Sequence, residues 1–228
     1  MELFHRKVLQ KSFLFQDMTH EECLKLIKCL SPQVKHFPKN DIMLLTGDSV
    51  QRIGIVLAGT ACAYLEHIDG SKMLMSNLAP MSVFGEVLVS TRTHKSPVTI
   101  YATSDVTAAF IEYQQIHSMC AKACAAHGTF LQNMLKAIGD KYFYLFDRIS
   151  ILREKKLRTR IMAYLYMLSE RGENTVVTIP FTKTMLADYL LVHRSALSKE
   201  LRRMEDDGIV CVKGREIEIL KTRYSNSS

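Results

Sequence analysis

Residues 182–214 read TKTMLADYLLVHRSALSKELRRMEDDGIVCVKG and decide the fold of the carboxyl-terminal region. Thr182 is placed to cap a helix over 183–190, because a threonine before a helix accepts a backbone hydrogen bond from its first turn. A second helix is predicted over 194–206, and short apolar stretches around a glycine turn over 209–219 predict a β-hairpin. Helix, tight turn, helix and hairpin form a winged helix-turn-helix, a unit that reads DNA through its second helix.

The second predicted helix has an apolar face and a polar face. Its apolar residues recur at the helical period and are expected to pack on the first helix: Leu197, Leu201 and Met204. Its other side carries basic and hydroxyl side chains: Arg194, Ser195, Ser198, Lys199 and Arg202. Arginine and lysine can donate to guanine O6 and N7 in a major groove, whereas small hydroxyls suit phosphate contacts. We therefore predict a DNA-reading face; the alternative is an ordinary helix with a solvated basic surface.

Composition indicates a folded chain with a polyanionic partner. The chain has 228 residues, of which 47% are hydrophobic, and this excludes disorder as the main state. The net charge is +7, and from Asp147 onward 16 basic residues stand against 11 acidic ones. This bias favours nucleic acid as the partner. We expect a cytoplasmic protein with no membrane partner and reduced cysteines, because no long apolar run occurs and the first residues, MELFHRKVLQ, carry charges.

The amino-terminal half has the pattern of a small β domain between helices. Residues 34–113 contain short apolar stretches that alternate with turn signals: Gly47-Asp48, Gly59, Asp69-Gly70, Pro80 and Gly85. This predicts many short strands that close into a jelly-roll-like β-roll. Residues 1–30 predict one or two short helices, with Thr19 and Glu22 as a capping box.

A long helix is predicted over 129–152, because apolar residues there alternate at steps of four and three for about three heptads. The residues of this seam are Leu131, Leu135, Ile138, Tyr142, Leu145 and Ile149. We expect the seam to pair two copies of the chain, since such a helix is longer than a small domain needs. The alternative is a core helix.

The sequence thus predicts an α+β chain in three parts. Residues 1–128 form an effector-sensing β-roll domain with flanking helices, 129–152 form the dimerisation helix, and 153–228 form the winged helix-turn-helix domain that binds DNA.

With this order of parts, the chain resembles the Crp-Fnr family of bacterial transcription regulators over nearly its whole length. The resemblance is carried by Leu45-Thr46-Gly47-Asp48 with Ile55-Val56-Leu57-Ala58-Gly59, by Val83-Phe84-Gly85-Glu86 at the family's phosphate-binding cassette, and by 182–214. It implies a β-roll of the cyclic-nucleotide-binding type that senses an effector. It also implies a homodimer on an imperfect palindrome of double-stranded DNA, with RNA polymerase as a further partner.

The family's recognition-helix pattern, Ser-Arg-Glu-x-x-x-Arg, falls on His193, Arg194, Ser195 and Lys199. The resemblance therefore assigns guanine reading to Arg194, and Thr182 and His193 complete the expected DNA contacts. Ser195 replaces a glutamate that would accept from cytosine, so the half-site is expected to differ at that base. Leu191 stands where the family usually has a turn glycine. If it is left-handed, it costs about 1–2 kcal/mol.

The candidate effector pocket consists of Phe84, Gly85, Glu86, Lys95 and Ser96. In members that bind cyclic nucleotides, an arginine and a serine or threonine hold the phosphate, and the glutamate holds the ribose hydroxyl. Here these two phosphate positions are Ser96 and Pro97, and proline has no donor. Lys95 could supply charge but no planar fork. We therefore expect the effector to be something other than cyclic AMP; its identity and any cofactor stay unknown.

Two other readings stay open. A redox or metal sensor would use Cys120 and Cys124, which lie between His117 and His127 on one side of a helix, although the two histidines would stand about 15 Å apart, too far for one ion. Buried cysteines are commoner, so we predict no metal site. The second reading is a ligand-sensing module with incidental DNA affinity. No nucleophile and base pair can be recognised, so an enzyme is not expected.

Overall fold

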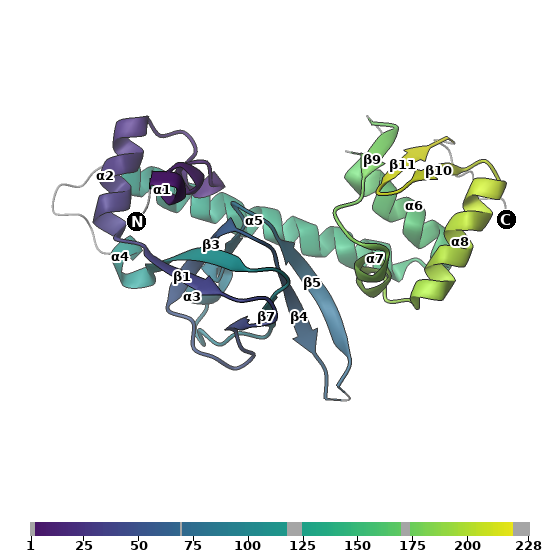
Figure 1. The fold of residues 1–228 in the computed structure, drawn as a ribbon, viewed down its shortest axis with the longest axis horizontal. Helices are drawn as coiled ribbons and strands as arrows, with labels where there is room; N and C mark the ends of the chain where they lie inside the picture. Colours follow the sequence, from purple (N-terminus) through teal and green to yellow (C-terminus); the bar gives the residue numbers. More distant parts are fainter. Residues whose placement is uncertain (1–2, 69, 118–124, 170–173, 221–228) are drawn as a thin grey trace. The chain divides into compact units, whose positions relative to one another are not determined.

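The computed structural model describes residues 3–68, 70–117, 125–169 and 174–220. The chain divides into two compact units, Met1–Lys141 and Tyr142–Ser228, both drawn in Figure 1. Helices and antiparallel sheets occur in both, which confirms the predicted α+β class. The long helix is shared between the two units, whereas the sequence predicts it as a segment of its own over 129–152.

The first unit begins with short helices, as predicted. They are α1 (Leu3–Gln10), the 3-10 helix η1 (Phe13–Phe15) and α2 (His20–Leu30). The capping box at the start of α2 is present: the Thr19 side chain accepts from the Glu22 amide at 3.3 Å, and the Glu22 carboxylate accepts from the Thr19 amide at 2.8 Å. This reciprocal pair fixes where α2 begins.

Eight strands form the β-roll. They are β1 (Gln33–Phe37), β2 (Ile42–Leu44), β3 (Arg52–Ala58), β4 (Ala61–Glu66), β5 (Lys72–Leu78), β6 (Val83–Phe84), β7 (Thr99–Ala102) and β8 (Val106–Glu112). One antiparallel sheet has the order β1-β8-β3-β6 and the other β2-β7-β4-β5. Side chains from both sheets share one core cluster, so the sheets pack face to face and the predicted roll is confirmed.

The interior of the roll is filled by small and aromatic side chains. Ala61 and Ala63 come from one sheet, and Phe84 and Phe110 come from the other. The two phenylalanine rings meet edge to face with their centroids 5.7 Å apart, a favourable geometry for aromatic pairs. Phe84 also lies against Gly54, where an added Cβ would come 2.0 Å from the ring. This position therefore requires glycine.

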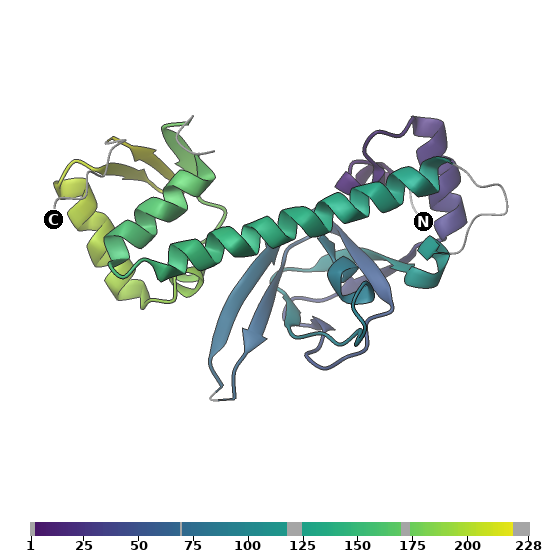
Figure 2. The ribbon, with the colours of Figure 1, turned by 180° about the vertical axis from the view of Figure 1, so that it is seen from behind.

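Helix α5 (Ala125–Arg153) follows the roll and the short helices α3 (Glu86–Val89) and α4 (Tyr113–His117). It includes the predicted 129–152 and extends beyond it at both ends. Figure 2 shows it as one continuous helix. In the first unit, Phe130 and Met134 are buried in a cluster with α1, α2 and β3. The Asn133 amide donates to the Leu14 and Gln16 carbonyl oxygens at 3.3 and 2.8 Å.

The second unit contains the winged helix-turn-helix at the predicted positions. Its elements after α5 are α6 (Leu157–Leu168), β9 (Val176–Thr178), α7 (Lys183–Tyr189), α8 (Arg194–Asp206), β10 (Val210–Lys213) and β11 (Glu216–Ile219). The strands form an antiparallel sheet of order β10-β11-β9. The Thr182 hydroxyl caps α7 by accepting from the Met185 amide at 3.2 Å.

Among the helices that the structure describes, none combines the length and the apolar character needed to cross a bilayer.

Candidate nucleic-acid interface

The second helix of the bihelical unit, α8, buries one face and exposes the other. Leu197, Leu201 and Met204 are buried against the rest of the second unit, as the helical period predicts. The residues singled out for DNA contact are exposed: His193 precedes the helix, and Arg194, Ser195, Ser198, Lys199 and Arg202 lie on it. Within the described residues, no side-chain hydrogen bond or ion pair engages these six. Their donors are therefore available to an external acceptor.

An ion-pair network from α6 holds α8 in place. The Arg158 Nε atom donates to Glu200 Oε1 at 2.6 Å. The Nη1 atom of the same guanidinium donates to Asp207 Oδ2 at 2.5 Å. Arg203 adds a longer contact of 3.6 Å to Glu200. Arg158 thus spans the middle and the end of α8, so it supports the helix and is not itself part of the exposed cationic face.

The turn between α7 and α8 is made without glycine. Leu191 has a φ of 53°, in the left-handed region that the sequence analysis considered for it. The Val192 amide donates to the Ala187 carbonyl oxygen at 3.0 Å. Arg160 donates to the Leu190 carbonyl oxygen at 2.8 Å. These contacts offset the backbone strain of a leucine in this conformation.

Three exposed basic residues close to Thr182 or in the hairpin were not predicted as DNA contacts: Lys183 at the start of α7, and Lys213 and Arg215 in the hairpin. Lys183 and Arg215 line a cavity of about 160 Å³, together with Thr182 and Gly214. Single charges give no periodic signal, and the position of Arg215 near the amino terminus of α7 appears only in the fold.

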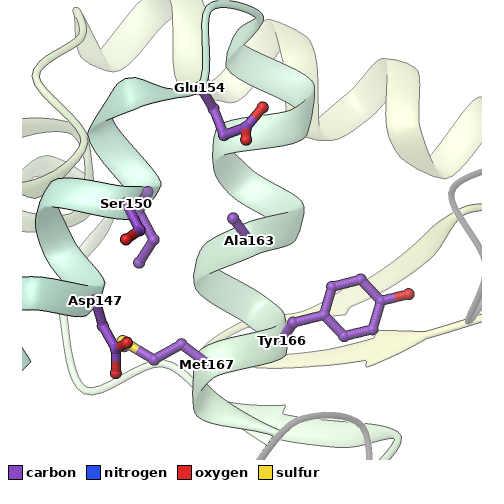
Figure 3. A pocket seen from close by; sticks show the side chains of 7 residues that line it. Asp147, Ser150, Glu154, Ala163, Tyr166 and Met167 are labelled. Carbon is purple, nitrogen blue, oxygen red and sulfur yellow. The ribbon is translucent and has the colours of Figure 1, made fainter. Parts of the chain in front are cut away.

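A second cavity of about 490 Å³ lies between the last turns of α5 and α6. Asp147 and Ser150 line it from α5, Glu154 lines it just after α5, and Ala163 and Met167 line it from α6 (Figure 3). Its two carboxylates would repel a phosphate backbone, so we do not assign it to the DNA interface.

The predicted dimer seam is largely uncovered in the single chain. Leu135, Tyr142, Leu145 and Ile149 are exposed by 66, 64, 42 and 61%. Leu131 and Ile138 differ, because they pack partly against the core of the first unit. Two aromatic residues that the heptad pattern omits, Phe143 and Phe146, are also exposed, by 65 and 57%. The amount of exposed apolar surface is unusual for a helix that stays in contact with water.

The candidate effector residues have different surroundings in the structure. Phe84 is part of the apolar interior of the roll. The buried Ser96 hydroxyl donates to the Val98 carbonyl oxygen at 2.7 Å, and Lys95 is exposed. Glu86 is fully buried at the start of α3, after Gly85, whose φ is 84°. A Cβ at Gly85 would lie 2.9 Å from the Arg52 carbonyl oxygen, so glycine fixes the position of Glu86.

The thiols that the structure places are other than the two on which the redox or metal reading depends. Cys120 and Cys124 lie outside the described residues. Burial raises the pKa of the Cys23 and Cys62 thiols, which disfavours the reactive thiolate form. In the ranges that the structure describes, no group of three or more potential ligands is arranged to hold a metal ion.

Comparison with known proteins agrees with the two-part structure of a β-roll and a helix-turn-helix. A family model for the cyclic nucleotide-binding domain matches residues 34–123, and one for the Crp-like helix-turn-helix domain matches residues 159–224. Together they match well over half of the chain. No curated protein gives a significant match in sequence.

Several solved structures share the fold. A double mutant of CooA from Carboxydothermus hydrogenoformans is 18% identical, with 91% of this chain and 94% of that chain covered and a TM-score of 0.70. The c-di-GMP-responsive global regulator CLP of Xanthomonas campestris is 15% identical, with coverage of 87% and 99% and a TM-score of 0.66. The catabolite activator protein of Thermus thermophilus is 19% identical, with coverage of 91% and 93% and a TM-score of 0.51.

At these identities, the solved structures show a shared fold, and the two domain models identify the family. Both models match in the order that the roll, long helix and winged helix-turn-helix require. The chain therefore belongs to the Crp-Fnr family of transcription regulators.

Proposed function

We propose that this regulator binds double-stranded DNA sequence-specifically and inserts α8 into a major groove. The observation that carries the proposal is a set of exposed α8 side chains that have no partner in the part of the chain that the structure describes, above all Arg194, Lys199 and Arg202. Arg194 is assigned to a guanine. Lys199, Arg202 and the hydroxyls of Ser195 and Ser198 are assigned to neighbouring bases and phosphates. Thr182 and His193 flank this set and are assigned to the DNA backbone.

The active form is proposed to be a homodimer on an imperfect palindrome, in which each subunit reads one half-site. The exposed row of Leu135, Tyr142, Leu145 and Ile149 supports this assembly, because pairing two copies would remove its apolar surface from water. RNA polymerase and a cytoplasmic location follow from a role in transcription and are part of the same proposal.

The roll is proposed to control DNA binding through an effector other than cyclic AMP. Two observations support this. The Ser96 hydroxyl is engaged by the Val98 carbonyl oxygen, and Pro97 offers no donor for a phosphate. CLP, which shares the fold, is described as responsive to c-di-GMP, so the fold accommodates ligands of different chemistry.

Selection of bound sequences from a random DNA pool tests the proposal. The purified full chain is used, with and without a metabolite extract from cells. We expect an enriched palindrome with half-sites about 10 base pairs apart, the spacing of successive major grooves. Absence of any enriched sequence in both arms would refute sequence-specific binding, and enrichment of a single unpaired half-site would refute the dimer.

A further inference from the structure

Glu86, a buried carboxylate of the roll, is paired with a lysine of the long helix. The Glu86 side chain has a relative exposure of 0%, and the Lys141 ammonium lies 2.5 Å from its Oε1 atom. The same ammonium donates a hydrogen bond of 2.9 Å to the Val83 carbonyl oxygen. Lys141 therefore makes two contacts from α5 with the segment 83–86, which we call the cassette.

The backbone of the cassette is held in one conformation, so the groups that Lys141 contacts have fixed positions. Val83 and Phe84 form β6 and pair with Ile55 and Gly54 of β3. Gly85 then turns the chain in a left-handed conformation that a side chain would not fit. Because the backbone that leads to the carboxylate is constrained, the two contacts of Lys141 define one position of the first-unit part of α5 on the roll.

This pair differs from another lysine ion pair of α5 in the first unit. Lys136 reaches Asp17 at 3.7 Å, and both side chains are more than half exposed, at 57 and 75%. Exposed pairs of this kind contribute little. A fully buried carboxylate is instead strongly unfavourable once its partner is removed. Among the described residues, Glu86 has no other cation and its Oε2 atom has no hydrogen-bond partner.

We propose that Lys141 takes the place of a ligand at the cassette and fixes α5 on the roll, so that the regulator binds its operator without a small molecule. This inference rests on the proposed DNA-binding function. An effector that reaches Glu86 must displace Lys141, and it is therefore expected to weaken DNA binding. Lys141 is a positioning residue, since it acts through α5 and has no contact with DNA assigned to it.

The test measures operator affinity by fluorescence anisotropy, and melting temperature, for the purified and dialysed full chain. The variants are Lys141→Met, Glu86→Met, the double variant Lys141→Met with Glu86→Met, and the matched control Lys136→Met. Wild type and Lys136→Met are expected to bind the operator without added metabolites. Lys141→Met is expected to melt lower and to bind about 5- to 150-fold more weakly, the usual range of coupling between sites.

The double variant distinguishes the effect of Lys141 on the position of α5 from its effect on the stability of the fold. It buries no unpaired charge, so its melting temperature is expected to recover, whereas its operator affinity is expected to stay low because methionine cannot donate to the Val83 carbonyl oxygen. If Lys141→Met fails to fold, the double variant alone carries this comparison. Recovery of both quantities would overturn the inference and leave the pair a purely stabilising role.

Two other results are decisive. If wild type binds its operator only when metabolite extract is present, or if Lys141→Met binds as tightly as wild type, the inference is wrong while the DNA-binding function stands. If wild type binds no DNA sequence in either condition, the proposed function itself fails.

Discussion

Replacing Arg194 by alanine tests the DNA-reading face most directly. Arg194 is exposed and has no side-chain partner among the described residues, so the folded protein is expected to keep its stability within about 0.5 kcal/mol when Arg194 is replaced. A bidentate contact to guanine contributes about 1–3 kcal/mol of discrimination. Arg194→Ala is therefore expected to weaken operator binding by about 5- to 160-fold.

Arg203 provides the matched control on the same helix. It stands nine positions after Arg194, about half a turn around the helix, and it contacts Glu200 at 3.6 Å. Arg203→Ala removes the same charge, so both variants are expected to lose non-specific affinity to a similar, small extent. Only Arg194→Ala is expected to lose preference for one base pair in each half-site.

Fluorescence anisotropy titrations measure the affinities of both variants at two salt concentrations. The DNAs are the operator, operators altered at single positions, and unrelated DNA. Equal losses for Arg194→Ala on every DNA, with a salt slope reduced by about one, would identify a phosphate contact and refute the guanine assignment. A loss by Arg203→Ala as large and as sequence-dependent as that of Arg194→Ala would refute the assignment of the exposed face.

Three further predictions concern assembly, folding and the effector. Leu145→Glu is expected to dissociate the dimer, because two carboxylates would meet in an apolar contact; sedimentation with an unchanged dimer mass would place the interface elsewhere. Thr182→Ala is expected to cost about 1 kcal/mol in chemical denaturation through loss of the bond to the Met185 amide, and Thr182→Ser should retain most of it. Millimolar cyclic AMP is expected to leave the melting temperature unchanged, whereas a ligand at a hundred times its dissociation constant would add about 2.7 kcal/mol; a saturable shift would show that Ser96 and Pro97 do not exclude it.

The winged helix-turn-helix could be read from the sequence because its signals are local. The α8 boundaries agree with the prediction, since Leu197, Leu201 and Met204 set the buried face and Gly208 follows the helix end. The capping threonine at 182 and the hairpin turn at 213–215 act over three or four residues. Each of these features is decided by neighbours in the chain.

The contacts between distant segments could not be read in this way. Arg158 and Glu200 are 42 positions apart, and Lys141 and Val83 are 58 apart. A lysine on a helix and a glutamate after a glycine turn have no periodic relation, so their pairing appears only when the roll places the cassette beside α5. The same holds for Leu131 and Ile138, which follow the heptad but pack against the core of the first unit. Periodicity identifies a row of apolar residues on a helix, but it does not identify the segment against which each of these residues packs.

Most of the exposed apolar row of α5 belongs to the same unit as the DNA-reading helix α8. Tyr142, Leu145 and Ile149 lie in the second unit, the one that contains α8. There, Arg148 is buried, with its guanidinium 4.5 Å from the centre of the Tyr189 ring at the end of α7. Since this contact joins the end of α5 to the helix-turn-helix, a dimer formed through the row would set the separation of the two α8 helices directly.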